Sequence, residues 1–147
     1  MAGASKDTGG KTIHATAVAL EGRAVLNTGP AGSGKSSLAL ELMAHGAALI
    51  ADDGVILSPA DDDAVIASAP ESITGRIEAR GIGILAAQAA GPAPVALVVD
   101  MGKIETDRLP PRREVRLGGV RLPAVHKCEG PAFAAAILQY LKEGRLD

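Results

Sequence analysis

The chain has 147 residues, of which 47% are hydrophobic and 22% charged, and its formal net charge is −2. This length fits a single domain, and the balanced composition excludes collagen-like and wholly disordered chains. No apolar run reaches about 18 residues, so no membrane-spanning helix is expected. The single cysteine excludes an internal disulfide.

The aromatic residues are limited to Phe133 and Tyr140, which leaves no platform on which the bases of single-stranded nucleic acid could stack. Residues 1–11 are rich in glycine and polar residues and lack the apolar stretch of a secretory signal. We therefore expect a flexible tail over 1–11, a single domain over 12–147, and a cytoplasmic protein that binds neither nucleic acid nor membranes.

Taken in chain order, short apolar or alternating runs predict strands over 12–20, 23–27, 47–51, 55–57, 64–68, 95–99 and, with a break at Gly118-Gly119, 115–122. Apolar residues at helical spacing predict helices over 36–45 and 132–142. Polar stretches and stretches rich in Pro and Gly predict a solvated acidic turn at 61–63 and loops over 91–94 and 102–111. This order of strands and helices indicates the α/β class.

Between the second strand and the first helix, Gly29, Gly34, Lys35 and Ser36 match the phosphate-loop pattern G-x-x-x-x-G-K-[ST]. The glycines let backbone N–H groups curl around an anion, and the following helix offers its positive end to that anion. Lys35 would reach the β- and γ-phosphates, and Ser36 would bind Mg²⁺. The predicted nucleotide-binding residues are Gly29, Pro30, Ala31, Gly32, Ser33, Gly34, Lys35, Ser36 and Ser37.

Two further segments are expected to meet this loop. If Glu21-Gly22 makes a hairpin, Leu20 faces Arg23, and counting outward places His14 opposite Gly29, although a purely structural histidine stays possible. A parallel strand–helix–strand unit places the end of strand 47–51 beside the loop. Asp52 and Asp53 could then hold Mg²⁺ or accept a proton, with one facing the γ-phosphate and the other bracing the site; a plain Asp-Asp-Gly turn is the alternative.

The charged, glycine-rich stretch 75–85 also carries candidate site residues. Glu78 and Arg80 lie two apart, on one side of an extended chain, and Gly81 follows. Glu78 would bind a metal and Arg80 would neutralise phosphate. The alternative is an exposed ion pair between the two side chains, which contributes little to stability. Five arginines over 108–121 suggest a protein-docking or subunit surface or a solvated face, and the negative net charge argues against nucleic acid.

Together these motifs resemble the catalytic domain of the HPr kinase/phosphorylase family. The resemblance covers most of residues 13–109 and rests on segments in the family's order: Ile13-His14, Gly29 to Ser36, Ala51-Asp52-Asp53, Ile77 to Ile84 with its Glu-x-Arg-Gly-x-Gly pattern, and Thr106-Asp107-Arg108-Leu109. It implies a phosphate-loop kinase domain with a mixed β-sheet, similar to the nucleotide-binding fold of HPr kinase and PEP carboxykinase.

The resemblance also implies an activity. Such a protein uses ATP and Mg²⁺ to phosphorylate a serine of HPr, the phosphocarrier protein of the sugar phosphotransferase system, and family members assemble as hexamers. Asp53 matches the residue that takes the serine proton, Lys35 and His14 match active-site residues, and Arg108 matches a catalytic arginine. Ser36 and Glu78 match metal ligands.

The chain also departs from the family pattern. The resemblance includes no amino-terminal regulatory domain, the region between residues 85 and 107 is short, and residues 122–127 stand where the family has a Pro-rich Gly-Arg-Asn element linked to dephosphorylation. These departures argue against the reverse phosphorylase activity and against control by metabolites. Two other functions fit the phosphate loop, namely a small-metabolite kinase or ATPase and a non-catalytic ATP-binding regulator.

Overall fold

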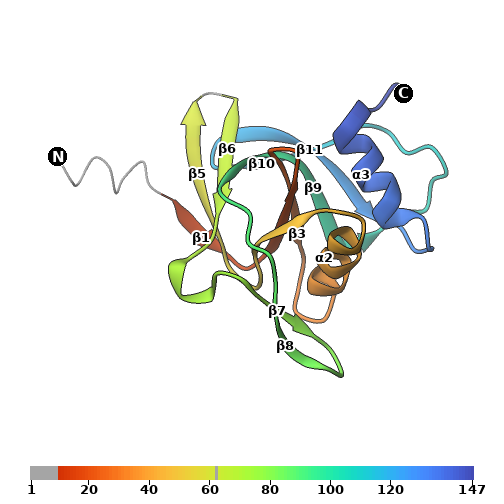
Figure 1. Cartoon of the computed structure of the whole chain (residues 1–147). Coiled ribbons are helices and arrows are strands. Elements are labelled where there is room, and N and C mark those ends of the chain that lie inside the picture. Colours follow the sequence, from red (N-terminus) through yellow and green to blue (C-terminus); the bar gives the residue numbers. More distant parts are fainter. Residues whose placement is uncertain (1–9, 62) are drawn as a thin grey trace.

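The structure is a computed structural model that describes residues 10–61 and 63–147, so most of the predicted tail lies outside the described residues. The strands are β1 (Lys11–Ile13), β2 (Thr16–Leu20), β3 (Arg23–Thr28), β4 (Ala48–Ala51), β5 (Val55–Asp61), β6 (Ala64–Ser68), β7 (Arg76–Ala79), β8 (Gly83–Ala86), β9 (Ala93–Ile104), β10 (Arg113–Leu117) and β11 (Val120–Lys127). The helices are α2 (Lys35–Ala44), α3 (Phe133–Glu143) and the short 3₁₀ helix η1 (Glu71–Ile73) (Figure 1).

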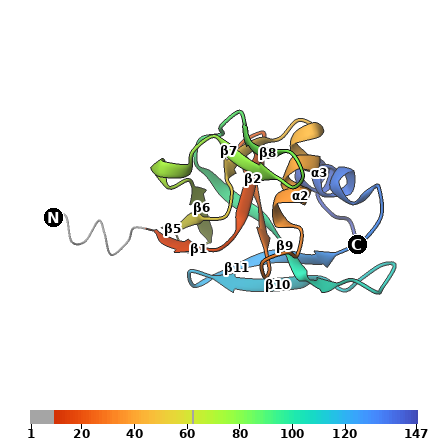
Figure 2. The same cartoon turned by 90° about the horizontal axis from the view of Figure 1, so that it is seen from below.

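Most strands belong to one curled, mixed sheet in the order β1-β5-β6-β9-β3-β2-β4. The hairpin β10–β11 joins this sheet through β11, which runs parallel to β9. A separate hairpin, β7–β8, lies on the opposite side of the molecule from β10–β11 (Figures 1 and 2). The mixed sheet with helices confirms the α/β prediction.

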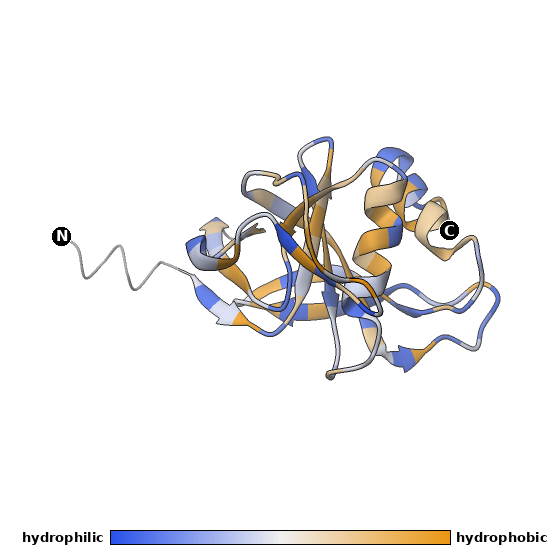
Figure 3. Cartoon of the chain, turned by 60° about the horizontal axis from the view of Figure 1, so that its bottom comes forward, coloured by the Kyte–Doolittle hydropathy of each residue, from blue (hydrophilic) through white to orange (hydrophobic). Residues whose placement is uncertain are grey.

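The sheet buries apolar residues on both faces. One face packs against α2 and α3, and its core includes Val25, Leu42, Leu97, Ile137 and Leu141. The other face lies inside the curl of the sheet and is lined by residues such as Leu26, Val55, Val65, Val98 and Leu122. Figure 3 shows the matching apolar stretches on both helices. Because the buried side chains are mainly Ala, Val, Ile and Leu, the layers pack closely without aromatic rings.

The predicted strand over 12–20 is broken in the structure. The chain bends at His14, so β1 pairs with β5 and only β2 continues alongside β3. Leu20 pairs with Arg23 as predicted, but the β2–β3 ladder ends at the pair formed by Thr16 and Asn27. His14 therefore does not face Gly29 across a ladder.

The unit β3–α2–β4 explains how the chain returns to the phosphate loop. β2 is antiparallel to both β3 and β4 and lies between them. β3 and β4 are therefore parallel but not adjacent, whereas adjacency is the usual arrangement of a parallel strand–helix–strand unit. Their carboxyl ends still lie at the same end of the sheet, which places Asp52 and Asp53 beside the start of α2.

Other segments differ from prediction in length and type. Residues 75–85 form most of the hairpin β7–β8, whose tip contains Gly81 with φ +87°. The strand predicted over 95–99 extends over 93–104, because Met101 is buried and the flanking residues still pair with neighbouring strands. At the acidic turn, Asp61 ends β5 and accepts a hydrogen bond from the Asp63 N–H, while residue 62 is outside the described residues. Within the described ranges no helix has the length and apolar character to cross a membrane.

Candidate functional site

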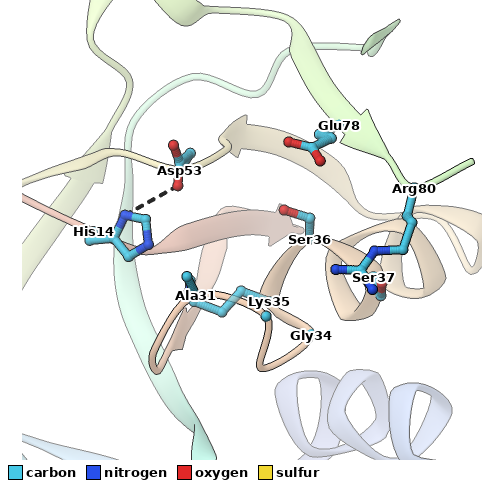
Figure 4. A pocket seen from close by; sticks show the side chains of 10 residues that line it. His14, Ala31, Gly34, Lys35, Ser36, Ser37, Asp53, Glu78 and Arg80 are labelled. Atoms are coloured by element: carbon cyan, nitrogen blue, oxygen red, sulfur yellow. Dashed lines mark ion pairs between the residues drawn. The ribbon is translucent and has the colours of Figure 1, made fainter. Parts of the chain in front are cut away.

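A pocket of about 350 Å³ opens at the carboxyl ends of β3 and β4. It contains most of the residues that the sequence singled out, and they come from the bend at His14, the phosphate loop with α2, the end of β4 and the hairpin β7–β8 (Figure 4). The lining residues are His14, Ala31, Gly32, Gly34, Lys35, Ser36, Ser37, Asp53, Glu78 and Arg80.

The phosphate loop is closed on itself by the side chain of Lys35. Its ammonium donates to the carbonyl oxygens of Gly29 and Pro30, over 2.8 and 3.0 Å. Gly29 has φ +135°, and a Cβ at this position would lie 3.0 Å from the backbone nitrogen of Gly102, so only glycine fits. Gly34, at φ +103°, then turns the chain into α2. The N–H groups of the first helical turn have no partner within the helix and suit an anion.

Asn27 is a buried residue of the site that the sequence analysis missed. Its side-chain amide donates to the Lys35 carbonyl oxygen over 3.1 Å, which fixes the start of α2 on β3. The sequence did carry a signal, since Asn27 is a polar residue at the end of an apolar strand directly before the phosphate loop.

Asp52 is buried and joins three elements. Its Oδ1 accepts hydrogen bonds from the hydroxyls of Thr16 (3.0 Å) and Ser36 (2.6 Å), and its Oδ2 accepts one from the Glu78 N–H (2.9 Å). The carboxylate thus fixes the positions of β2, α2 and the hairpin strand β7 relative to one another. Thr16, which the sequence analysis also missed, is fully buried and contributes the link to β2.

Asp53 points the other way, into the pocket. Its side chain is 76% exposed, and its Oδ1 lies 3.1 Å from the Nδ1 of His14 (Figure 4). Asp53 has φ +68°, a left-handed conformation that is uncommon outside glycine and tends to occur at functional sites. The two neighbouring carboxylates therefore separate as predicted, with one inside the protein and one facing the pocket.

The hairpin β7–β8 supplies the opposite wall. Ile77 and Ala79 are buried while Glu78 and Arg80 are exposed, so the alternation of the strand directs both charged side chains to the pocket. Figure 4 shows the Arg80 side chain directed toward Ser37. The hydrogen bond from the Glu78 N–H to Asp52 fixes this wall relative to the loop. Gly81 forms the tip beyond the pocket.

The oxygen atoms of the pocket fit a magnesium ion that is shared with phosphate. Among the described residues, no group of three His, Cys, Asp or Glu side chains could hold a metal alone. Mg²⁺ commonly needs only one or two carboxylates beside substrate phosphates and water, and Ser36 and Glu78 offer such hard oxygen donors at the pocket wall. Asp52 already accepts three hydrogen bonds, which suits it to bracing Ser36 rather than to direct coordination.

Arg108 is the one predicted catalytic residue that the structure does not bring to this pocket. It is exposed in the segment that follows β9 and does not line the pocket. The segment is anchored by Glu105 and Arg113, whose side chains make two hydrogen bonds of 3.1 and 3.0 Å, and by Arg145, which donates to the Pro110 carbonyl oxygen.

The contact between Glu105 and Arg113 also shifts the pKa values of both side chains. Hydrogen bonding to Arg113 holds the pKa of the Glu105 carboxyl below its ordinary value, and the same hydrogen bond raises the pKa of Arg113. His126 has its Nδ1 4.0 Å from Oε1 of Glu105. In the arginine-rich stretch, Arg112, Arg113, Arg116 and Arg121 all contact groups of their own chain.

Comparison with known proteins gives relatives with a consistent name. The chain is 47% identical over 73 residues to an HPr kinase/phosphorylase of Geobacillus thermodenitrificans, and 43% identical over 75 residues to one of Peptoclostridium acidaminophilum. Each alignment covers about half of this chain and 24% of the relative, so the chain spans about a quarter of the length of these curated relatives.

A solved structure shares the fold. The HPr(Ser) kinase/phosphatase of Coxiella burnetii superposes with a TM-score of 0.74 over 90% of this chain and 94% of that one, at 24% sequence identity. The family model of the HPr serine kinase C-terminal domain matches residues 7–105, about two thirds of the chain. This match covers the phosphate loop, the acidic pair and the Glu78 hairpin, and it shows that the chain belongs to the family of HPr serine kinase C-terminal domains.

Proposed function

We propose that this chain is an ATP- and Mg²⁺-dependent kinase that phosphorylates a serine of the phosphocarrier protein HPr. One observation carries the proposal: a phosphate loop and an exposed carboxylate, Asp53, share one pocket, and His14 lies 3.1 Å from that carboxylate. The family membership and the names of the relatives support HPr as the acceptor.

In this proposal the phosphate loop binds the β- and γ-phosphates of ATP. Lys35 exchanges the carbonyl oxygens of Gly29 and Pro30 for phosphate oxygens, which releases its ammonium to neutralise their charge. Bound Mg²⁺ would supply further charge neutralisation between the phosphates, held by Ser36 and Glu78. Arg80, on the same wall, adds positive charge to the rim of the pocket.

Asp53 is proposed as the base of the transfer step. The serine Oγ of the acceptor forms a bond to the γ-phosphorus while the bond to the β–γ bridging oxygen breaks and leaves ADP with the electron pair. The serine proton passes to the exposed carboxylate of Asp53. His14 orients this carboxylate through the 3.1 Å contact between its Nδ1 and Oδ1 of Asp53. Asp52 contributes as a positioning residue, since it holds Ser36 and the Glu78 backbone but does not line the pocket.

Arg108 keeps its proposed catalytic role on the resemblance alone. Because it lies outside the pocket, that role requires either a movement of its segment or an arginine from a second copy in the proposed homo-oligomer. An equimolar mixture of the Arg108→Ala and Asp53→Asn variants distinguishes the two. Regained activity in the mixture indicates a second copy, and continued inactivity indicates movement within one chain.

The decisive experiment incubates the purified chain with HPr, Mg²⁺ and γ-labelled ATP and then maps the labelled residue. Label on a serine of HPr supports the proposal. Release of phosphate without a labelled protein indicates a small-metabolite kinase or ATPase, and nucleotide binding without turnover indicates a regulator. Phosphorylated HPr incubated with inorganic phosphate tests the reverse reaction separately, and light scattering tests the hexamer expected from the resemblance.

A further inference from the structure

A second lysine, Lys127, reaches the phosphate loop from the far end of the chain. It is the last residue of β11, and its ammonium donates to the carbonyl oxygen of Ser33 over 3.2 Å, across 94 positions of sequence. The side chain is half-buried. Lys127 lies beyond residue 105, where the family match ends, so nothing in that match accounts for this contact.

Two backbone features fix the position of Lys127 beside the loop. His126 pairs with Asp100 on β9, but Lys127 pairs with Ile104, so the regular ladder is interrupted between His126 and Lys127, and the residues inserted there belong to β9. The strand that carries the extra residues bends locally, and such irregularities are common beside active sites. The Lys127 carbonyl oxygen accepts a hydrogen bond of 2.8 Å from the Glu105 N–H, which fixes the end of the strand in this position.

The contact with Ser33 controls the orientation of one peptide group. In a trans peptide the C=O and the N–H point in opposite directions. Gly34 lines the pocket, whereas Ser33 and Lys127 do not. While Lys127 holds the Ser33 carbonyl outside the pocket, the N–H of Gly34 therefore points inward. Gly34 has φ +103° and no side chain, so without this contact the peptide could turn over at little cost.

We propose that Lys127 is a positioning residue for nucleotide binding, which holds the Ser33–Gly34 peptide with its N–H directed at the polyphosphate of the nucleotide. The inference rests on the nucleotide-binding part of the proposed function and is independent of the acceptor. Lys35 and Lys127 then act on different parts of the loop: Lys35 contacts the carbonyls at its start, and Lys127 contacts the carbonyl just before α2.

The test compares Lys127→Met, which removes the donor, with Lys127→Arg, which keeps one. Lys142→Met, on the exposed side of α3, is the charge-matched control. Pyrophosphate with Mg²⁺ is titrated into each protein by calorimetry, and the Gly34 amide is followed by ¹⁵N NMR. We expect Lys127→Met to bind pyrophosphate about ten- to a hundredfold more weakly. This is the range expected when the hydrogen bond from the Gly34 N–H to the charged phosphate is lost. Its Gly34 resonance should lose the shift that pyrophosphate produces in the unmodified chain.

Two further readouts separate positioning from a general loss of structure. The melting temperature of Lys127→Met should stay within about two degrees of the control, because the variant loses a single half-exposed hydrogen bond. In the kinase assay, KM for ATP should rise while kcat changes by less than about threefold, since the Gly34 N–H binds the ground state and the transition state alike. Lys127→Arg should recover most of the affinity.

The outcomes distinguish this inference from the proposed function. If the unmodified chain binds neither pyrophosphate nor ATP, both fail. If it binds them and Lys127→Met binds as tightly, with the same shift at Gly34, only the role of Lys127 is refuted. A chain that binds nucleotide through Lys127 but labels no serine of HPr keeps this inference and loses the proposed acceptor.

Discussion

The hydroxyl of Ser36 donates to Oδ1 of Asp52 over 2.6 Å and so joins the first turn of α2 to the end of β4. The same carboxylate accepts hydrogen bonds from the Thr16 hydroxyl and from the Glu78 N–H, so both of its oxygens act only as acceptors. An amide in place of the carboxylate must direct its NH₂ at one of these donors. A buried donor without a partner costs about 1–3 kcal/mol.

We therefore expect Asp52→Asn to lower the free energy of unfolding by about 1–3 kcal/mol, as measured by urea denaturation. Phosphoryl transfer should fall as well, because Ser36 and Glu78 lose their common anchor. Asp63→Asn, on the exposed tip, is the control and should leave both quantities unchanged. Unchanged stability of Asp52→Asn would mean that the buried network does not hold the site together.

Asp53→Asn should separate binding from chemistry. The side chain is 76% exposed and the backbone is left-handed, a conformation that asparagine tolerates well, so the unfolding free energy should change by less than about 0.5 kcal/mol. Because the variant lacks the base, transfer to HPr should fall by about 10²- to 10⁴-fold with unchanged ATP affinity. Transfer at near wild-type rate refutes the assignment of Asp53 as the base.

Gly29→Ala tests the close approach of β9 to the phosphate loop. A Cβ at this position would meet the backbone nitrogen of Gly102 at 3.0 Å and the Ser33 hydroxyl at 2.8 Å, and φ is +135°. We expect a loss of about 1–3 kcal/mol in unfolding free energy together with weaker nucleotide binding. Gly91→Ala, where the added Cβ meets open space, should cost much less. Equal costs at both positions would contradict the steric explanation.

Glu105→Gln tests how the Glu105–Arg113 pair anchors the segment that follows β9, through the pH dependence of the melting temperature. Hydrogen bonding to Arg113 lowers the pKa of Glu105 below its ordinary value of 4.5. A carboxyl whose pKa is lowered by folding stabilises the fold above its unfolded pKa and loses this effect as pH falls through the folded pKa. The variant should therefore melt a few degrees below the unmodified chain at pH 7, and the difference should shrink as the pH falls below 4.5.

Calorimetric melting between pH 7 and pH 3 measures this difference. Glu143→Gln, at the exposed end of α3, controls for the general effect of acid on the chain. A difference that stays constant over the whole range would show that the Glu105–Arg113 contact has no electrostatic part.

Local sequence signals predicted the parts of the site that depend on neighbouring residues. The phosphate loop, α2 and the opposite directions of Asp52 and Asp53 follow from glycine spacing, helical periodicity and strand alternation. Two of the residues that were missed are fixed by distant contacts: Thr16 meets Asp52 across 36 positions, and Lys127 meets Ser33 across 94. Asn27, in contrast, contacts Lys35 only 8 positions away. The segment that carries Arg108 is held by the contacts of Glu105 with Arg113 and of Arg145 with Pro110, which no periodicity reveals.

The bend at His14 shows the same limit. Alternation continues through residues 12–20, so the sequence favours one long strand, whereas tertiary pairing sends β1 to β5 and keeps β2 on β3. His14 nevertheless lines the same pocket as Ala31 and Gly32 of the phosphate loop, because the bend places its side chain there.

The place of β11 in the sheet has a consequence for any shortened form of this protein. Val98 to Asp100 of β9 pair with β3 on one edge and with β11 on the other. A fragment that stops at residue 105 would keep the phosphate loop, the acidic pair and the Glu78 hairpin, yet leave a row of unpaired amides beside freshly uncovered Val and Leu side chains. Such an edge invites another chain to add its own strand, so truncation at the family boundary should yield aggregates rather than a minimal enzyme.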